Sequence, residues 1–492
     1  MTPASPKILF ATSEAYPLIK TGGLADVSGA LPRALHALGA DIKILLPGYA
    51  EVMHQSKHAT LFAKLPNPFT SGTVELLETR LPDSTVPILI VRYDAFFNRK
   101  GGPYQQLNGQ DWPDNFLRFG LLSYVAAWMG SSANVTDWQP DLIHCNDWQT
   151  GLAPAYLRFW PGRKPPTIMT IHNLAYQGVF GPESVPALLL PAESFKMQGL
   201  EFYGNLSFLK AGVFYADRIT TVSPTYAREI QQEASGFGMH GLLHERRSVL
   251  SGVINGIDMQ EWDPQHDPHL PHRYSAKRLN NKVKNKAALQ QEMGLAVEPN
   301  TPLVAIISRI TYQKGSDLVL GVLHDLVREG VQIALLGAGD TIIEEAFTNQ
   351  AQKHRGRIAV KIGYAEDLSH RMEAGADMFL MPSRYEPCGL NQMYSQRYGT
   401  PPIAHATGGL VDTIVNATPT HLATGDATGF LFREMTAQAC TDAVRRAIRM
   451  YRNPTAWQQI QITGMQRDFS WQKSAEAYMS LYRSLVHLGS TH

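Results

Sequence analysis

The sequence predicts an α/β protein with two doubly wound domains, each a parallel sheet with helices on both faces. Three observations lead to this prediction. The chain has 492 residues, which is long for a single hydrophobic core. Short apolar runs alternate with helix-like or loop segments, as strands do when helices cover both faces of their sheet. This series begins twice, the second time after Val253–Asp258.

The first domain, residues 1–255, is predicted from apolar runs that have the length of strands. The first run is followed by a loop and then by a helical pattern that begins near Gly23. Six such runs occur in this half: Lys7–Thr12, Ile42–Leu46, Val86–Val91, Leu142–His144, Thr167–Ile171 and Arg218–Val222.

The second domain, residues 256–469, repeats the pattern. The stretch Trp262–Tyr274 carries three prolines and several histidines, which is typical of a linker or an irregular excursion. Apolar residues at roughly helical spacing over Trp471–Leu488 predict a last helix, and we expect residues 470–492 to pack back on the first domain. Five strands are predicted: Leu303–Ser308, Gln332–Leu336, Ile358–Ile362, Met378–Met381 and Pro402–His405.

The bulk composition argues against several classes of protein. An apolar fraction of 44% and a net charge of +1 give no general attraction to nucleic acid or to an anionic membrane. Cys145, Cys388 and Cys440 lie far apart without CxxC spacing, which argues against a disulfide framework or a structural zinc site. No signal-peptide pattern and no run of roughly 18 apolar residues is found. We therefore expect a soluble cytoplasmic protein.

The first candidate site is the segment Lys20-Thr21-Gly22-Gly23, which follows the first predicted strand. Ligands of open α/β sheets bind beyond the carboxyl ends of the strands. Two glycines before a helix let the backbone approach a ligand, and the free N–H groups, the helix dipole and Lys20 favour an anion. The alternative is a tight turn with a solvated lysine. The segment is neither GxGxxG nor a Walker loop, so it carries no nucleotide motif by itself.

The phrase Thr-Gly-Gly-Leu-x-Asp occurs a second time, at Thr407–Asp412, without a lysine in front of it. A strand, a glycine pair and a helix start impose similar backbone demands in both halves. We therefore expect the second copy to be a structural strand-to-helix turn. The segment Leu336–Asp340 lacks the third glycine of a dinucleotide fingerprint and is also predicted to be such a turn.

Arg309 and Lys314 bracket a loop that follows a predicted strand and opens a helix. Two cations beside a helix N-terminus suit a diphosphate, whose charge must be neutralised when it becomes a leaving group. The alternative is a pair of solvated surface cations, which is the commoner fate of these residue types.

The loop after Met378–Met381 carries Glu386 just ahead of another helix start. A carboxylate there can accept hydrogen bonds from sugar hydroxyls, and the amides of Gly389–Asn391 can bind phosphate. Alternatively, Glu386 is a first-turn acid favoured by the helix dipole. Cys388 in the same loop has no base or metal ligand near it in sequence, and a small buried side chain is its simpler interpretation.

His172 comes directly after a predicted strand of the first half, and Asp147 lies three residues beyond the end of another. Both can therefore lie at the cleft that two such domains would form. A lone aspartate or histidine is equally compatible with a helix cap or a satisfied structural residue.

Together these motifs resemble the family of bacterial glycogen synthases and plant starch synthases. Their order and their strand-end positions, from about Ile8 to about Asp412, argue against coincidence. The family consists of retaining glucosyltransferases of the GT-B fold, which implies two Rossmann-like domains facing each other across a cleft. The matching segments are Lys20–Val27, Asn146-Asp147-Trp148, Thr170–Asn173, Val253–Asp258, Ser308-Arg309 with Lys314-Gly315, and Pro382–Leu390.

The resemblance implies how the donor, ADP-glucose, is bound. Arg309 and Lys314 hold its diphosphate, and Lys20 lies near the phosphates and the transferred glucose. Tyr364 is placed to stack on adenine. The other residues that the resemblance assigns to the donor are Gly22, Gly23, Ser383, Cys388, Gly389, Leu390 and Asn391.

The resemblance also implies the chemistry at the sugar. His172 lies beside the reacting glucose and Glu386 binds its hydroxyls, so these two join Lys20, Arg309 and Lys314 as catalytic residues. The departing diphosphate helps to deprotonate the acceptor 4-hydroxyl on the same face, with retention and without an assigned protein nucleophile. No cofactor and no metal are expected. The residues that border the sugar and the acceptor are Asp26, Tyr104, Asp147 and Asn255.

The sequence departs from the family pattern at two positions. Gln149 stands where relatives commonly have His, which bears on local acceptor contacts. Asn391 stands where Thr is usual, although its backbone N–H can still bind phosphate. The acid that the wider GT-B pattern often has eight residues after Glu386 is Tyr394 here, as in the synthase branch.

The leading hypothesis is an enzyme that transfers glucose from ADP-glucose to the non-reducing end of a glycogen or α-1,4-glucan primer. A second hypothesis keeps the fold but uses UDP-glucose or a small acceptor. A third is a glucan-binding protein without catalysis, which would not need phosphate ligands such as Lys314. A nicotinamide dehydrogenase fits poorly, because no complete fingerprint is present. Domain closure is expected, since phosphate ligands come from both halves.

Overall fold

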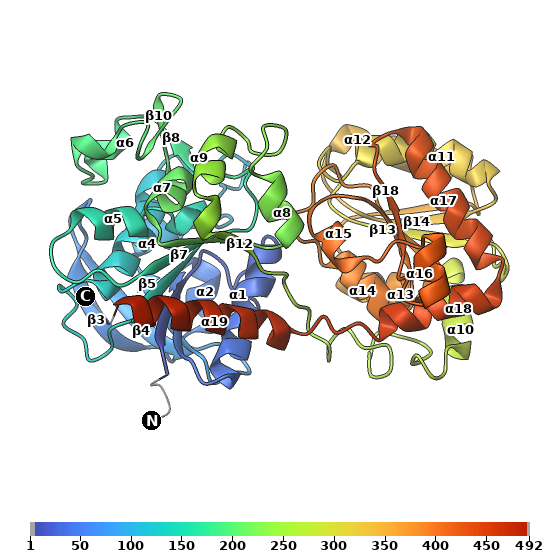
Figure 1. Ribbon diagram of the computed structural model, residues 1–492, viewed down its shortest axis with the longest axis horizontal. Helices are drawn as coiled ribbons and strands as arrows, with labels where there is room; N and C mark the ends of the chain where they lie inside the picture. Colours follow the sequence, from blue (N-terminus) through green and yellow to red (C-terminus); the bar gives the residue numbers. More distant parts are fainter. Residues whose placement is uncertain (1–4, 490–492) are drawn as a thin grey trace. The chain divides into compact units, whose positions relative to one another are not determined.

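The computed structural model describes residues 5–489, which divide into two compact units, and Figure 1 shows the sheet and the helices of each. Unit 1 contains the described residues up to Val222, Ala227–Gly256 and Trp471–Gly489. Unit 2 contains Ser223–Tyr226 and Ile257–Ser470. The main change of unit, between Gly256 and Ile257, lies one residue from the boundary that the sequence predicts.

Unit 1 is built on a nine-stranded sheet in the order β12-β11-β7-β6-β1-β2-β5-β4-β3. All neighbouring strands are parallel except that β4 is antiparallel to both β3 and β5. A second, three-stranded sheet has the order β8-β10-β9. The strands of the large sheet are β1 Lys7–Ala11, β2 Asp41–Pro47, β3 Thr60–Pro66, β4 Thr73–Arg80, β5 Pro87–Arg92, β6 Leu142–Asn146, β7 Thr167–Ile171, β11 Arg218–Thr221 and β12 Leu250–Gly252; those of the small sheet are β8 Val179–Phe180, β9 Glu201–Phe202 and β10 Asn205–Ser207.

The prediction of a wholly parallel first sheet is wrong at the edge formed by β3 and β4. Both strands alternate between polar and apolar residues, as in Thr-Val-Glu-Leu-Leu-Glu-Thr-Arg of β4. An antiparallel edge exposes part of its surface to water, so its strands need no continuous apolar run. The six strands that were predicted are the buried ones, and each is found within one or two residues of its predicted bounds.

The helices of unit 1 cover both faces of its large sheet. The chain moves from β1 to β2 through α1, but in the opposite direction from β5 to β6 through α4, so right-handed crossovers place α1 and α4 on opposite faces. The helices in this part of the chain are α1 Gly23–Ala37, α2 Ala50–Gln55, α3 Asp94–Phe97, α4 Asn115–Gly130, α5 Ala153–Phe159, α6 Ser184–Ala187, α7 Phe208–Tyr215, α8 Pro224–Glu229 and α9 His240–Glu245.

The last helix, α19 (Trp471–Gly489), packs against α1 within unit 1 (Figure 1). The hydroxyl of Tyr482 lies 2.7 Å from Nδ1 of His144, a buried residue of β6. The Ser474 hydroxyl donates to the carbonyl of Ile254 at 2.6 Å. Apolar contacts and these two hydrogen bonds attach the end of the chain to its first half.

Unit 2 is a six-stranded, all-parallel sheet in the order β15-β14-β13-β16-β17-β18. Separate hydrophobic clusters cover its two faces, one around Val322 and Val444 and the other around Met372 and Phe379, which confirms the doubly wound prediction. The strands are β13 Leu303–Ile307, β14 Gln332–Gly337, β15 Ile358–Ile362, β16 Met378–Met381, β17 Pro402–His405 and β18 Phe430–Phe432. The helices are α10 Asn280–Met293, α11 Ser316–Arg328, α12 Thr341–Lys353, α13 Glu366–Gly375, α14 Asn391–Arg397, α15 Gly408–Thr413, α16 Pro419–Thr424, α17 Ala437–Tyr451 and α18 Pro454–Met465.

The segment Trp262–Tyr274 is irregular, as predicted, but it is packed into unit 2 rather than being a loose linker. The ring of Trp262 is stacked between His370 and Tyr394, at centroid distances of 3.9 and 3.7 Å. The buried Asp267 accepts hydrogen bonds from His370 and Tyr398. Burial favours the neutral form of Asp267, but these hydrogen bonds outweigh it and hold its pKa below the usual value.

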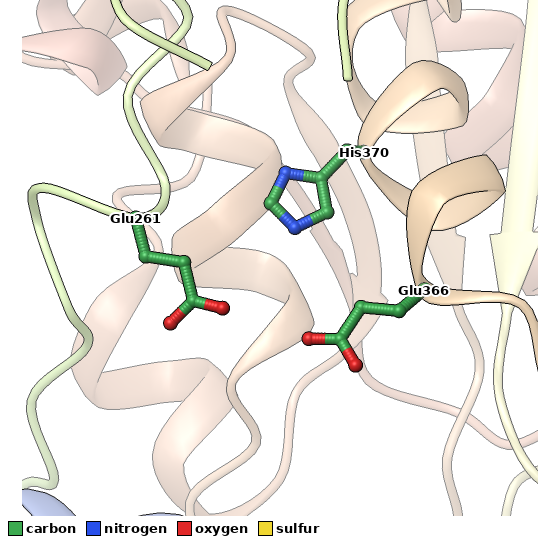
Figure 2. Close-up of side chains that lie close together, drawn as sticks. All are labelled: Glu261, Glu366 and His370. Atoms are coloured by element: carbon green, nitrogen blue, oxygen red, sulfur yellow. The ribbon is translucent and has the colours of Figure 1, made fainter. Parts of the chain in front are cut away.

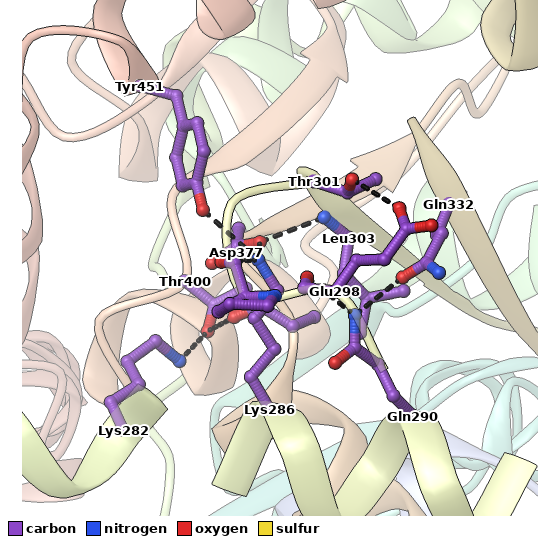
Figure 3. A network of polar contacts seen from close by, with 12 residues as sticks. Lys282, Lys286, Gln290, Glu298, Thr301, Leu303, Gln332, Asp377, Thr400 and Tyr451 are labelled. Atoms are coloured by element: carbon purple, nitrogen blue, oxygen red, sulfur yellow. Dashed lines mark hydrogen bonds and ion pairs between the residues drawn. The ribbon is translucent and has the colours of Figure 1, made fainter. Parts of the chain in front are cut away.

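Helix α10 is fixed by buried polar groups instead of an apolar stripe (Figure 3). Lys286 pairs with Asp377 at 2.6 Å, and Lys282 donates to the hydroxyl of Thr400 at 2.7 Å. Burial lowers the pKa of Lys282 to about 7. Because such groups are stable inside a protein only when they are paired, this network specifies how α10 docks on unit 2.

None of the helices within residues 5–489 combines the length and the apolar character that crossing a membrane requires.

Candidate functional site

The predicted residues of unit 1 lie at the carboxyl edge of its large sheet. Strand β1 lies between β2 and β6, and β6 pairs with β7, all in parallel. Their carboxyl ends therefore meet at one edge. The side-chain amide of Asn146 donates to the carbonyl of Ala11 at 3.0 Å, which joins the ends of β6 and β1.

Glu14, just beyond β1, organises the loop that contains the glycine pair. Its buried carboxylate accepts hydrogen bonds from the backbone N–H and the hydroxyl of Thr21, both at 2.5 Å, and from the N–H of Gly22 at 3.2 Å. The hydroxyl of Tyr104 also donates to it. Burial, and then the nearby charge of Glu14, raise the pKa of Tyr104 well above its ordinary value. A single carboxylate thus holds the loop and one predicted sugar-site residue together.

Lys20 and Asp26, both predicted site residues, form an ion pair of 2.7 Å. Asp26 lies in the first turn of α1, where the helix dipole favours a negative charge. The Lys20 ammonium also lies 5.4 Å from the ring centroid of Tyr16. The pair holds the lysine at the helix N-terminus that the sequence predicts as an anion site.

The glycine pair itself faces open space. A Cβ atom added at Gly22 or Gly23 would meet nothing within 4 Å, and the backbone of Gly22 is extended with φ −154°. Internal packing therefore does not require glycine at these positions. The prediction that a ligand approaches the backbone closely at these glycines stays a prediction.

His172 and Asp147, both predicted site residues, are in direct contact. The Asp147 carboxylate accepts a hydrogen bond from the backbone N–H of His172 at 2.8 Å. Nε2 of His172 lies 2.9 Å from Oδ1 of Asn146, whose amide nitrogen is already donating to Ala11. The His172 ring therefore carries its proton on Nε2, which leaves Nδ1 with a lone pair. Burial lowers the pKa of His172 to about 3, so the ring is neutral at pH 7.

Asp147 occupies a conformation that few residues other than glycine adopt, with φ +56°. Burial raises the pKa of its carboxyl group to about 7, against the opposing effect of the N–H groups of His172 and Asn173. Strained residues with a displaced pKa are typical of functional sites.

Two further residues of unit 1 lie away from these contacts. Asn255 is buried after β12, and within the described chain it forms no hydrogen bond with the other predicted site residues. Gln149 is also buried, and its side-chain oxygen accepts no hydrogen bond from the residues that the structure covers.

Unit 2 brings three predicted residues into direct contact. Strands β13 and β16 are neighbours, so the loops that follow them lie side by side. Nζ of Lys314 lies 2.6 Å from Oε2 of Glu386, and the hydroxyl of Ser383 donates to the same oxygen at 2.9 Å. The Glu386 side chain is 6% exposed and the Lys314 side chain 18% exposed. Three predicted site residues of unit 2 are thus joined by an ion pair and a hydrogen bond.

The two loops are braced by contacts that motif analysis did not predict. Arg384 forms an ion pair of 2.6 Å with Asp317, and its guanidinium lies 3.4 Å from the ring centroid of Tyr312. The backbone of Gln313 accepts a hydrogen bond from the N–H of Arg384 at 2.8 Å. Arg309 is exposed, and among the described residues its side chain makes only a long 3.5 Å contact, to the side chain of Gln313. Its guanidinium is thus available to an incoming anion.

The start of α14 carries the predicted amides. The side chain of Asn391 donates to the carbonyl of Ile307 at 2.7 Å, which ties this helix start to the end of β13. The side chain is therefore occupied, and only the backbone of Asn391 is available to a phosphate. Gly389 has φ +72°, and a Cβ there would lie 2.5 Å from the side chain of Gln392, so the turn requires glycine. Among the described residues, the N–H groups of Gly389, Leu390 and Asn391 donate no hydrogen bond.

Tyr364 and Cys388 have contrasting surroundings. Tyr364 follows β15, is 79% exposed, and donates its hydroxyl to Glu366 at 2.5 Å. Cys388 is 4% exposed, as its simpler interpretation predicts. The Tyr364 side chain is therefore largely exposed to solvent, whereas Cys388 is packed into its loop.

The second Thr-Gly-Gly copy is a strand-to-helix turn between β17 and α15, as predicted. A Cβ at Gly408 would lie 1.9 Å from the carbonyl oxygen of Glu386, and one at Gly409 would lie 2.2 Å from that of Cys388. Gly409 also donates its N–H to the Glu386 carbonyl at 3.0 Å. The glycines of the second copy pack against the backbone of the Glu386 loop, whereas those of the first copy contact no other part of the chain through a Cβ position.

Comparisons with known proteins show which families this chain resembles. The family model described as the starch synthase catalytic domain matches residues 7–245, and that of glycosyl transferases group 1 matches residues 291–461. The glycogen synthase of Nitrosospira multiformis is 50% identical over 494 residues, covering 99% of each chain. That of Nitrosomonas europaea is 52% identical over 486 residues, covering 98% of each.

Solved structures give the same relationship. The catalytic domain of starch synthase IV from Arabidopsis thaliana, bound to ADP and acarbose, matches with a TM-score of 0.87 and 30% identity. The match covers 98% of this chain and 100% of that one. Sucrose-phosphate synthase from Thermosynechococcus elongatus matches with a TM-score of 0.59 at 17% identity, which shows a shared fold alone. The chain therefore belongs to the family of glycogen and starch synthases, and it is a glycosyltransferase with the two-domain α/β fold of the GT-B class.

Proposed function

We propose that this protein is an ADP-glucose-dependent glycogen synthase that adds glucose to the non-reducing 4-hydroxyl of an α-1,4-glucan with retention of configuration. The observation that carries the proposal is the Lys314–Glu386–Ser383 group beside the start of α14. It combines a cation for a phosphate, a carboxylate for sugar hydroxyls and unused backbone N–H groups. A nucleotide sugar needs these three kinds of contact.

The donor is held and activated by residues of unit 2. Lys314 and Arg309 neutralise the diphosphate, and the N–H groups of Gly389–Asn391 bind its oxygens at the helix N-terminus. Glu386 and Ser383 accept hydrogen bonds from the glucose hydroxyls. The face of Tyr364 stacks on adenine. Because Lys314 is fixed by Glu386, little side-chain freedom is lost when charge develops on the leaving group.

The transfer step breaks the bond between C1 of glucose and the phosphate oxygen and forms a bond between C1 and the acceptor O4. The proton of the 4-hydroxyl passes to an oxygen of the departing diphosphate. His172 is a poor base because of its low pKa, so it acts by orienting the reacting glucose through its neutral ring. Lys20, fixed by Asp26, adds positive charge for the phosphates. The glycine pair lets the backbone approach them, with the N–H of Gly23 as the donor, because that of Gly22 is bonded to Glu14.

The sugar and acceptor are bordered by polar side chains of unit 1. Asp26, Tyr104 and Asn255 are assigned to the transferred glucose and Asp147 to the acceptor. No cofactor or metal is assigned to the transfer, because Arg309, Lys314 and the α14 N-terminus supply the positive charge that the diphosphate requires. The partners are ADP-glucose and a glucan primer, with neither nucleic acid nor membrane. The place of action is the cytosol, which suits three cysteines that form no disulfide within the described chain.

The donor is tested by incubating the protein with labelled ADP-glucose or UDP-glucose, each with and without glycogen. We expect label in polymer from ADP-glucose, dependent on glycogen. A preference for UDP-glucose, or label only in small products, would replace this proposal with the alternative donor or acceptor. Tight glycogen binding without any transfer would point to a binding protein.

The role of Lys314 is tested by Lys314→Ala. Loss of one cation at the developing charge is expected to lower kcat/KM for ADP-glucose by about 100-fold or more. Lys284→Ala is the matched control, because Lys284 is an exposed lysine on α10 of the same unit. Unchanged kinetics of Lys314→Ala with both donors would refute the assignment.

A further inference from the structure

A histidine and two glutamates converge in unit 2 outside the proposed transfer residues (Figure 2). Glu261 comes from the irregular segment after the change of unit, Glu366 is the first residue of α13, and His370 lies one turn further along that helix. One ligand atom of each lies within 4.8 Å of those of the other two. Residues four apart on a helix share a face, so α13 presents Glu366 and His370 together.

His370 is held rigidly with one nitrogen directed at the carboxylates. Its side chain is 2% exposed and stacks on Trp262 with an interplanar angle of 12°. Nδ1 lies 2.8 Å from Oδ2 of the buried Asp267, which fixes the proton on Nδ1. Nε2 forms no hydrogen bond within residues 5–489, and Figure 2 shows a ring nitrogen facing Glu261 and Glu366.

A carboxylate behind an imidazole is the usual support of a metal-binding histidine, because it sets the tautomer and increases the basicity of the other nitrogen. Asp267 occupies this position relative to His370. The opposite nitrogen then faces two acidic side chains, the exposed Glu261 and the half-buried Glu366, whose carboxylate oxygens can ligate a cation together with it. The buried nitrogen, its supporting carboxylate and the two acids are separate features that indicate the same kind of ligand.

We propose that Glu261, Glu366 and His370 form a binding site for a divalent transition-metal ion of the zinc class. Zn²⁺ binds imidazole nitrogen and carboxylate oxygen at about 2.0–2.2 Å. The three ligand atoms lie within 4.8 Å of one another, so small movements of their side chains would bring each of them to this distance from one ion. A set with one imidazole is less suited to Mg²⁺ or Ca²⁺, and a set without thiolate is less suited to Cu⁺. Three protein ligands leave a position for water.

The ion would tie the segment that contains Glu261 to the first turn of α13. That turn follows the loop of Tyr364, whose hydroxyl already contacts Glu366. No step of glucosyl transfer passes through the ion, so the site goes beyond the proposed function and does not depend on it. Binding to the folded state alone raises the free energy of unfolding by mass action.

Isothermal titration calorimetry of the full chain with ZnCl₂, after removal of metals with EDTA, tests the proposal. The wild type is expected to bind one Zn²⁺ at this site. The double variant Glu261→Gln, Glu366→Gln keeps side-chain size and should bind it about 100-fold more weakly or not at all. His421→Ala is the matched control, since His421 and Asp426 form an exposed histidine–carboxylate pair elsewhere in unit 2.

Two further measurements separate this site from adventitious binding. Co²⁺ should give a d–d spectrum without a thiolate charge-transfer band. This d–d spectrum should be absent in the double variant and present in His421→Ala. Zn²⁺ should raise the unfolding temperature of the wild type and not that of the double variant. Equal Zn²⁺ affinity in the wild type and the double variant, or no saturable binding to the wild type, would overturn the proposal.

Discussion

Asp147 combines a strained backbone conformation with a carboxyl group whose pKa is displaced. Its carboxyl group has a folded-state pKa of about 7, above the ordinary value of 3.8, because of burial. A carboxyl whose pKa is raised by folding favours the folded state below pH 3.8, and this contribution is lost as the pH rises through 7. At pH 8 the buried charge therefore lowers the free energy of unfolding.

Asp147→Asn is predicted to stabilise the protein at pH 8 and not at pH 3.5. The amide keeps an acceptor for the N–H of His172, and asparagine tolerates positive φ, so the gain is expected to be about 1–2 kcal/mol. Urea unfolding at the two pH values measures it. Asp141→Asn is the control, because Asp141 also accepts a backbone N–H, that of Lys7. Lower stability of Asp147→Asn at pH 8 would contradict the argument.

Glu14→Gln is predicted to impair catalysis while leaving unit 1 folded. Donors from Thr21, Gly22 and Tyr104 converge on this carboxylate, and an amide would present N–H groups where acceptors are needed. The loop of Lys20 would lose its anchor, so kcat/KM for ADP-glucose should fall by about 10–100-fold. Steady-state kinetics with circular dichroism test this, with the exposed Glu51→Gln as control. Wild-type kinetics would show that Glu14 does not position the loop.

The sequence placed Lys314 and Glu386 after predicted strands, but their direct pairing was not predicted. That pairing depends on β13 and β16 being neighbours in the sheet, which only the structure shows. Glu14 was not predicted. It is a single acid just beyond the first strand, and it belongs to none of the motifs that indicated an anion site. The brace of Arg384 and Asp317 depends on a cross-loop distance that no sequence spacing reveals.

At the scale of elements, the two Thr-Gly-Gly turns can be compared by the same Gly→Ala substitution in each. Gly409→Ala would force a Cβ to 2.2 Å from the Cys388 carbonyl and is expected to destabilise unit 2 by about 1–3 kcal/mol. Gly22→Ala meets nothing within 4 Å and should change stability by less than about 0.5 kcal/mol. Thermal unfolding of both variants measures the difference. Equal effects would mean that the two turns do not differ in packing.

Elements with buried apolar patterns were predicted, and those fixed by other forces were not. The last helix, α19, was recognised from its apolar spacing. Helix α10 was missed because its buried face contains Lys282 and Lys286, whose stability depends on Thr400 and Asp377 far away in sequence. Strands β3 and β4 were missed because half-exposed antiparallel strands lack continuous apolar runs.

At the scale of the whole chain, two doubly wound units and a returning helix were predicted from the restart of the strand pattern. The sequence-based assignment to the family is confirmed by relatives about 50% identical over nearly the full chain. The proposed metal site at His370 was not predicted, because Glu261 lies more than a hundred residues before Glu366 and His370, and a single Glu–His pair four residues apart is weak evidence for a metal site. Its recognition required the fold.

The most direct test of the central claim is the fate of labelled glucose from ADP-glucose after transfer to glycogen, measured by digestion of the product with β-amylase. This enzyme removes maltose from non-reducing ends through α-1,4 bonds. Retention at the 4-hydroxyl predicts that the incorporated label is released as maltose. Absence of incorporation, or label that stays in polymer resistant to β-amylase, would contradict the account.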